Sequence, residues 1–180
     1  MVDASRDWVI TGRERHVARA RFGMLPYPQR ALRTPDYLYI INFKPGRWPM
    51  GDPYNLGQNE VPNFNTLANN TFITFPDLDA SPTKAWLIGK RNEPKWKWHY
   101  NYAFAKRPRE ELFILKSDPD QIKNVAANPK YAAIKKKLNA KLMAELKRTG
   151  DPRVTGDGST FDKLPFAGDF RFTPNRPKKK

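Results

Sequence analysis

Residues 31–43, with the sequence ALRTPDYLYIINF, determine the fold of this chain. The segments 31–34 and 37–43 are rich in aliphatic, β-branched and aromatic residues, which is typical of strands. Only Pro35 and Asp36 separate them, and so short a connection joins antiparallel neighbours in a hairpin. The stretch therefore predicts the centre of a small antiparallel sheet.

Two further strands are expected before and after this hairpin. Residues 8–11 (WVIT) have the composition of a short buried strand, which Gly12 ends. Residues 111–115 (ELFIL) have the same character and precede a Ser-Asp-Pro-Asp turn at 117–120. The sheet should therefore contain about three to four strands.

One long amphipathic helix is predicted after these strands. Asn128 can cap it, Pro129 suits its first position, and Gly150 followed by Pro152 should end it. Its apolar residues recur every three or four positions, at Tyr131, Ile134, Leu138, Leu142 and Leu146. We expect this stripe to pack on the sheet with the lysines facing water, which gives an α+β fold.

A long insertion separates the hairpin from the strand at 111–115. Residues 44–109 are expected to be loop-rich, because Pro, Gly and Asn dominate their first part. A connection of this length is either functional or packed against something else. The predicted organisation is one domain over residues 8–152, with the insertion 44–109 inside it, followed by an extended basic tail at 153–180.

The charge balance points to polyanionic partners. The 180 residues include 33 Lys and Arg against 18 Asp and Glu, a formal net charge of +15, which attracts sulfated glycan, nucleic acid or anionic lipid. No apolar run reaches the length of about 18 residues that suggests a membrane span, so no membrane partner is expected. The first residues carry no apolar signal region, which predicts a cytoplasmic location for the chain as written.

The best candidates for substrate binding follow the first predicted strand. Arg13, Arg15 and His16 offer two guanidinium groups and an imidazole, which can hold a sulfate or carboxylate by charge-assisted hydrogen bonds. The alternative is structural: the arginines would pair with Glu14 and nearby acids, and His16 would be satisfied within the fold.

Residues 95–102 (KWKWHYNY) interleave aromatic and basic side chains. Trp96, Trp98 and Tyr100 are candidates for stacking on sugar rings. They could equally anchor the insertion on a core.

Catalytic motifs are missing from the sequence. It contains no G-x-S-x-G, P-loop, H-E-x-x-H or G-x-G-x-x-G pattern, and no cysteine. Asp157, Asp162 and Asp169 lack the alternating carboxylates of a calcium loop. We therefore assign neither catalytic residues nor a metal site to this chain.

Three stretches taken in order resemble the C-terminal region of sulfatases: TGRERH at 11–16, YPQRALRT at 27–34 with the strand 37–42, and EELFIL at 110–115 with NVA at 124–126. The heparan N-sulfatase (N-sulfoglucosamine sulfohydrolase) group is most similar, and the closing TGDP at 149–152 fits it as well. Phe113 and Ile114 depart from that pattern, which usually has Tyr and Asp there.

The resemblance implies an alkaline-phosphatase-like enzyme of which this chain is only the smaller, C-terminal subdomain. Intact members hydrolyse sulfate esters or sulfamates of sulfated carbohydrates, with calcium and a formylglycine made from the Cys or Ser of C-x-P-x-R or S-x-P-x-R. Neither pattern occurs in this sequence, so the resemblance implies an inactive chain that needs an N-terminal catalytic domain as its partner. Intact relatives are typically periplasmic, secreted or lysosomal.

The resemblance also places the 11–16 segment at the rim of the active site, with Arg15 and His16 nearest to substrate. A hypothesis of another class is a stand-alone basic module that binds sulfated glycan or nucleic acid. We favour sulfated carbohydrate over nucleic acid as the partner. A steep loss of affinity with salt would be expected of such a module.

Overall fold

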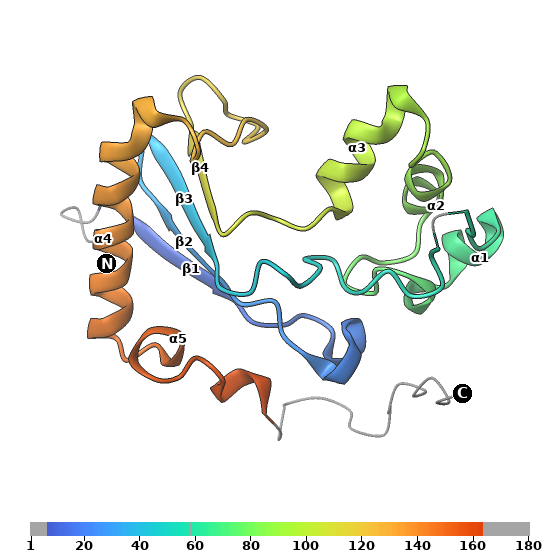
Figure 1. Cartoon of the computed structure of the whole chain (residues 1–180), viewed down its shortest axis with the longest axis horizontal. Coiled ribbons are helices and arrows are strands. Elements are labelled where there is room, and N and C mark those ends of the chain that lie inside the picture. The colour runs from blue at the N-terminus through green and yellow to red at the C-terminus, as the bar shows by residue number, and fades with distance from the viewer. Residues whose placement is uncertain (1–6, 58, 164–180) are drawn as a thin grey trace. The chain divides into compact units, whose positions relative to one another are not determined.

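In the computed structural model, which describes residues 7–57 and 59–163, the chain divides into two compact units (Figure 1). We name them the sheet unit, to which the described residues 7–14, 28–45 and 108–163 belong, and the helical unit, to which the described residues 15–27, 46–57 and 59–107 belong.

The described part of the sheet unit contains one four-stranded antiparallel sheet with the order β1-β2-β3-β4. Its strands are β1 (Val9–Arg13), β2 (Gln29–Arg33), β3 (Tyr37–Asn42) and β4 (Glu110–Ile114). The β2–β3 hairpin pairs Leu32 with Tyr39, and β4 pairs Leu112 with the same tyrosine. The predicted α+β class, hairpin and two further strands are confirmed, but β1 is an edge strand without a buried residue and continues to Arg13, so the expectation of a buried strand ended by Gly12 was wrong.

The predicted helix is also confirmed, as α4 (Ala132–Arg148) preceded by the 3-10 turn η4 (Pro129–Tyr131). The side chain of Asn128 accepts a hydrogen bond from the backbone of Lys130, as an N-terminal cap does. Beyond α4, Gly150 has φ of 72°, a conformation that glycine adopts without strain. Its N–H donates to the Lys147 carbonyl and that of Asp151 to the Leu146 carbonyl, the two hydrogen bonds of a Schellman motif.

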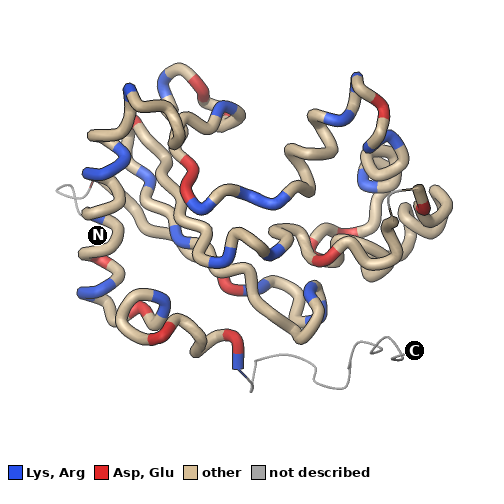
Figure 2. Tube along the Cα trace, in the orientation of Figure 1, with Lys and Arg blue, Asp and Glu red and all other residues tan. Residues whose placement is uncertain are grey.

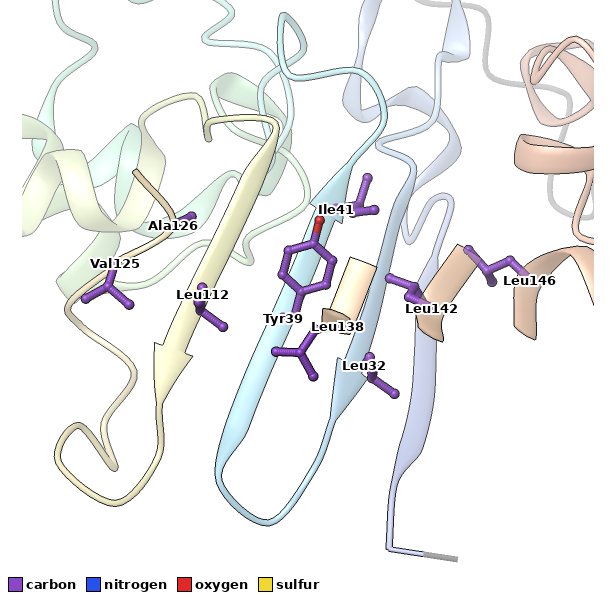
Figure 3. Close-up of a cluster of buried hydrophobic side chains, with 9 residues drawn as sticks. All are labelled: Leu32, Tyr39, Ile41, Leu112, Val125, Ala126, Leu138, Leu142 and Leu146. Carbon is purple, nitrogen blue, oxygen red and sulfur yellow. The ribbon is translucent and has the colours of Figure 1, made fainter. Parts of the chain in front are cut away.

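One face of the sheet packs on α4 (Figure 3). The cluster combines sheet residues with the helix stripe and with the segment after β4: Leu32, Tyr39, Ile41, Leu112, Val125, Ala126, Leu138, Leu142 and Leu146. All nine are buried. Removal of this apolar surface from water is the main stabilisation of the sheet unit.

Both long connections of the sheet start at the same end. β1 runs into residues 15–27 and β3 runs into the insertion, and the four residues Arg13, Gln29, Asn42 and Glu110 stand at that end of their strands. The backbone N–H of Asn42 donates to the carbonyl of Arg109, and its side-chain Nδ2 donates to Pro108 at 2.7 Å. Asn42 thereby fixes the point where the insertion ends and β4 begins.

The insertion carries more regular structure than the expected loop-rich segment. It contains α1 (Phe64–Asn69), η3 (Thr71–Ile73), α2 (Pro82–Gly89) and α3 (Pro94–Phe104), and residues 15–27 add the turns η1 (Ala18–Ala20) and η2 (Phe22–Met24). The helices α1, α2 and α3 share a buried core of Leu67, Phe75, Ala85, Ile88 and Phe104. The prolines that signal loops in the sequence begin α2 and α3, because the first position of a helix needs no backbone N–H donor.

Arg21 and Lys84 are buried cations of the helical unit. The guanidinium of Arg21 donates to Asp77 Oδ2 at 2.5 Å and to the carbonyls of Trp48 and Pro49, each at 2.7 Å. The ammonium of Lys84 donates to three backbone carbonyl oxygens, and burial lowers its pKa to about 8. Both charges are supplied with partners, as buried charges must be.

The structure differs from the expected extended tail over residues 153–163, which belong to the sheet unit. They form the short helix α5 (Pro152–Thr155) and the 3-10 turn η5 (Thr160–Asp162). The side chain of Arg153 is buried in ion pairs with Glu14 and Asp162, and this contact keeps the segment folded against the unit. Residues 164–180 of the predicted tail lie outside the described residues.

A chain of polar contacts connects α4 with the sheet. The Tyr39 hydroxyl donates to Glu110 Oε1 at 2.5 Å and accepts from Asn139 Nδ2 at 2.8 Å, and Lys135 Nζ lies 3.2 Å from Glu110 Oε2. Burial raises the pKa of Glu110, but the hydrogen bonds from Tyr39 and Lys135 outweigh it and leave the pKa below its ordinary value. Ionised Glu110 therefore stabilises the folded state.

We predict that Tyr39→Phe lowers the free energy of unfolding by about 1 kcal/mol at neutral pH, because a buried hydrogen bond is lost. The folded pKa of Glu110 is depressed, so its stabilisation is complete above the unfolded value and is lost as the pH falls through the folded value. The variant should therefore lose less stability on acidification than the parent. Urea unfolding at neutral pH and at about pH 4 measures both effects.

Tyr37→Phe is the control, since Tyr37 lies two residues earlier on β3 and outside this chain of contacts. An equal loss of stability in both variants would contradict the role assigned to the Tyr39 hydroxyl.

Candidate functional site

Gly12, in the TGRERH segment, lies against the side chain of Arg30. A Cβ atom at position 12 would stand 2.8 Å from Arg30 Cδ, closer than non-bonded carbon atoms approach. Arg30 is only 7% exposed. Its Nε donates to Asp151 Oδ2 at 2.6 Å and its Nη2 to Glu14 Oε1 at 2.8 Å. Because Gly12 has no side chain, the buried side chain of Arg30 can pass over β1 at this position.

Glu14 joins this guanidinium to a second one. Its other oxygen, Oε2, lies 2.6 Å from Arg153 Nη2, which also reaches Asp162 at 2.8 Å. Burial lowers the pKa of Arg30 and of Arg153, but their carboxylate partners outweigh this and raise both above the ordinary value. We call Glu14, Arg30, Asp151, Arg153 and Asp162 the arginine network; it contains two cations and three carboxylates.

The predicted substrate-binding residues are positioned differently from one another. Arg13 is the last residue of β1 and is partly exposed, and its carbonyl accepts from Arg30 Nη1 at 3.3 Å. Arg15 and His16 belong to the helical unit, where Arg15 is partly exposed and the His16 side chain is 65% exposed. Glu14, which the structural alternative pairs with these arginines, forms ion pairs with Arg30 and Arg153.

His16 lies close to a buried carboxylate. Its Nδ1 is 3.9 Å from Asp77 Oδ1, which accepts a hydrogen bond from the backbone of Val17 at 3.0 Å, while the other carboxylate oxygen binds Arg21. The carboxylate thus fixes the backbone directly after the imidazole and leaves the ring exposed. His16 can donate to an anion from this position.

The three candidate sugar-stacking residues do not form a common platform. On α3, Trp98 is 51% exposed and stacks on Tyr102 with ring centroids 5.2 Å apart, whereas Trp96 meets Trp86 edge-on at 4.6 Å. Tyr100 instead packs into the core of the helical unit, and burial raises its pKa. Residues two apart on a helix point in different directions, so the alternation in the sequence does not gather these rings. Their function stays a prediction.

A pocket of about 500 Å³ lies in the helical unit beside α3. Tyr100 lines it together with Trp48, Arg91 and Lys97. Sequence reasoning missed this pocket because Trp48 and Leu56, which also line it, are far from α3 along the chain. The spacing of Lys97 and Tyr100, three residues apart on one helix, was the available signal.

The described carboxylates do not fit the calcium that the family resemblance implies. Among residues 7–57 and 59–163, no group of three or more His, Asp or Glu side chains could hold a metal ion. Asp157 accepts from the backbone and hydroxyl of Ser159, and Asp162 pairs with Arg153; Asp169 lies outside the described residues. Within the described part, no helix combines the length and apolar character of a membrane span.

Comparison with known proteins relates the chain to sulfatases. Two curated proteins from Formosa agariphila, each described as an ulvan-active sulfatase, are similar to it. The first is 29% identical over 154 residues, which is 83% of this chain and 22% of the relative; the second is 28% identical over 125 residues, which is 69% and 18%. The chain thus spans about a fifth of the length of these relatives.

A solved structure of a 2-O GAG sulfatase is also similar, at 16% identity and a TM-score of 0.41, over 89% of this chain and 21% of that one. No protein-family model matches the chain. The relation to sulfatases therefore rests on the curated relatives, and the heparan N-sulfatase group stays a prediction.

We predict that Gly12→Ala lowers the free energy of unfolding by about 1–3 kcal/mol, the usual effect of overpacking. The new methyl group must displace Arg30, which four hydrogen-bonding partners hold in place. Urea unfolding followed by circular dichroism measures the loss.

Gly46→Ala is the matched control, because a Cβ at position 46 has no atom within 4 Å. Equal stability of the two variants would show that Arg30 adapts without loss, against the expected result.

Proposed function

We propose that this chain is the C-terminal part of a sulfatase that hydrolyses sulfate esters or sulfamates of sulfated carbohydrates. The similarity to two ulvan-active sulfatases, of which the chain spans about a fifth, carries this proposal. The antiparallel sheet packed by α4 agrees with the subdomain that the sequence resemblance implies. Within this proposal, the finer assignment is to enzymes of the heparan N-sulfatase type.

The nucleophile and the metal belong, in this proposal, to an N-terminal catalytic domain. The 180 residues contain neither C-x-P-x-R nor S-x-P-x-R, and the described carboxylates do not fit calcium. The chain's own contribution is to bind and orient the substrate. Its cationic side chains suit that task, since sulfate is an anion that guanidinium groups and imidazolium bind by charge-assisted hydrogen bonds.

The arginine network helps to position the residues that we propose for substrate binding. It fixes the end of β1 through the contacts of Arg30 with the Glu14 carboxylate and the Arg13 carbonyl. A binding side chain is effective when its backbone is held within a few tenths of an ångström, roughly 0.5 Å. We propose that Arg13, Arg15 and His16 contact the substrate from this segment.

A stand-alone module that binds sulfated glycan or nucleic acid is the second candidate, favoured by the net charge of +15. Figure 2 shows Lys and Arg along α4 and in the segment between α3 and β4. The exposed lysines of α4 are Lys136, Lys137, Lys141 and Lys147. A helix face of this kind can bind a polyanion without any catalytic domain.

The coding DNA upstream of Met1 separates the two candidates. We expect an in-frame or adjacent segment that encodes C-x-P-x-R or S-x-P-x-R, and we expect sulfate release from a sulfated polysaccharide when the two parts are produced together. Absence of such a segment, combined with glycan binding that weakens steeply with salt, would support the binding module instead.

In the assembled enzyme, we predict that His16→Ala lowers kcat/KM by about tenfold, the effect of losing a hydrogen bond to a charged group. The fold should be retained, because the His16 side chain is 65% exposed. Circular dichroism and steady-state sulfate release measure the two properties.

His99→Ala, at an exposed position on α3, is the control and should keep the parent activity. Unchanged kinetics for His16→Ala would remove His16 from the substrate site.

A further inference from the structure

The pocket beside α3 has the size and composition of a ligand site. Its volume of about 500 Å³ lies within the range of about 300–1,000 Å³ that is typical of ligand pockets. None of its lining residues belongs to the 11–16 segment, so it is a separate candidate site. Its walls combine aromatic rings, carboxamides and two cations.

The aromatic wall is rigid. Trp48 and Tyr100 both meet Phe75 edge-on, with ring centroids 5.8 and 6.4 Å apart, and Phe75 is fully buried. Two rings held by a common buried ring lose little freedom when a ligand packs on them. Their apolar faces suit the C–H face of a sugar ring.

The polar wall suits hydroxyl groups. Asn59, Asn92 and Asn101 contribute carboxamides to the lining. Each carboxamide can donate and accept hydrogen bonds, as a sugar hydroxyl does. Three such groups around an aromatic wall favour a carbohydrate over an apolar ligand.

The charge of the lining favours an anion. Arg91 and Lys97 line the pocket, and among the described residues no Asp or Glu does. Arg91 is held by the backbone carbonyls of Gly57 and Glu60 at 3.1 and 3.3 Å. The positive charge of Arg91 opposes the rise that burial causes in the pKa of Tyr100. Lys97 is exposed to solvent as well as lining the pocket.

One face of α3 carries a cation, an aromatic ring and a carboxamide together. Lys97, Tyr100 and Asn101 stand at positions i, i+3 and i+4 of the helix, which are neighbours on its surface. Trp98 does not line the pocket and stacks instead on Tyr102. Of the three stacking candidates from the sequence, the pocket therefore supports Tyr100.

From these observations we infer that the pocket beside α3 binds a sugar residue that carries a sulfate or carboxylate, with Trp48 and Tyr100 against the ring and Lys97 on the anionic group. The carbohydrate class rests on the proposed function. The site is a second point of contact for an extended sulfated chain, apart from the residues at 13–16.

Binding of a heparin-derived tetrasaccharide and its chemically desulfated counterpart to the full chain tests the inference by calorimetry. We expect Lys97→Gln to weaken binding of the sulfated probe by about tenfold, as expected for the loss of one charge-assisted contact. The matched control is Lys95→Gln, on the same helix with the same charge change but outside the pocket, over the Trp96 ring. It should stay within about twofold of the parent, since surface charges contribute little.

A second variant, Asn101→Ala, should weaken both probes, because its amide serves hydroxyls and not the sulfate. Equal effects of the two lysine variants, or no binding of the sulfated probe by the parent chain, would overturn the site. An active assembled sulfatase whose KM is unchanged by Lys97→Gln would overturn the site and leave the proposed function standing. If only Lys97→Gln lost binding and no C-x-P-x-R or S-x-P-x-R segment were encoded upstream, the pocket would stand as a binding site and the proposed sulfatase function would be rejected.

Discussion

The sheet unit depends on one buried guanidinium, that of Arg30. It connects Glu14, directly after β1, with Asp151, which follows the end of α4 and lies 121 residues after Arg30 in the chain. A buried charge that loses a partner is costly, commonly about 3–5 kcal/mol, so both segments must stay in place together. The contact explains why TGRERH and TGDP, which flank the unit in sequence, both contain an acid and a glycine: the acids hold Arg30, while Gly12 leaves it room and Gly150 ends α4.

Local periodicity was sufficient to predict the sheet and α4. Alternation around Tyr39, the cap at Asn128 and the terminating Gly150 each act within a few residues, which is the range that a sequence pattern covers. The partners of Glu14 lie beyond that range, since Arg153 follows it by 139 residues. Composition therefore indicated that Glu14 would pair with a cation but could not indicate which one.

The insertion was harder to predict, for two physical reasons. First, proline has two opposite effects on helices. Pro82 and Pro94 begin helices here, whereas proline in the interior of a helix breaks it. Second, the aromatic residues of the insertion alternate as they would on a strand, yet α3 turns Trp98 towards solvent and Tyr100 towards the core. Of the three candidate stacking residues, Tyr100 lines the pocket, and the pocket also includes Trp48 and Leu56, which folding brings from elsewhere in the chain.

The hydrogen bonds by which Asn42 fixes the end of the insertion have an evolutionary consequence. Because β3 and β4 are hydrogen-bonded neighbours, the two ends of the insertion meet within the width of a strand pair, about 5 Å. Asn42 holds that junction with contacts from residues of the sheet unit alone. The sheet can therefore accept a short turn, or an insertion of another sequence, at the same place. Relatives that share this sheet can therefore differ in the whole insertion while the strands stay unchanged.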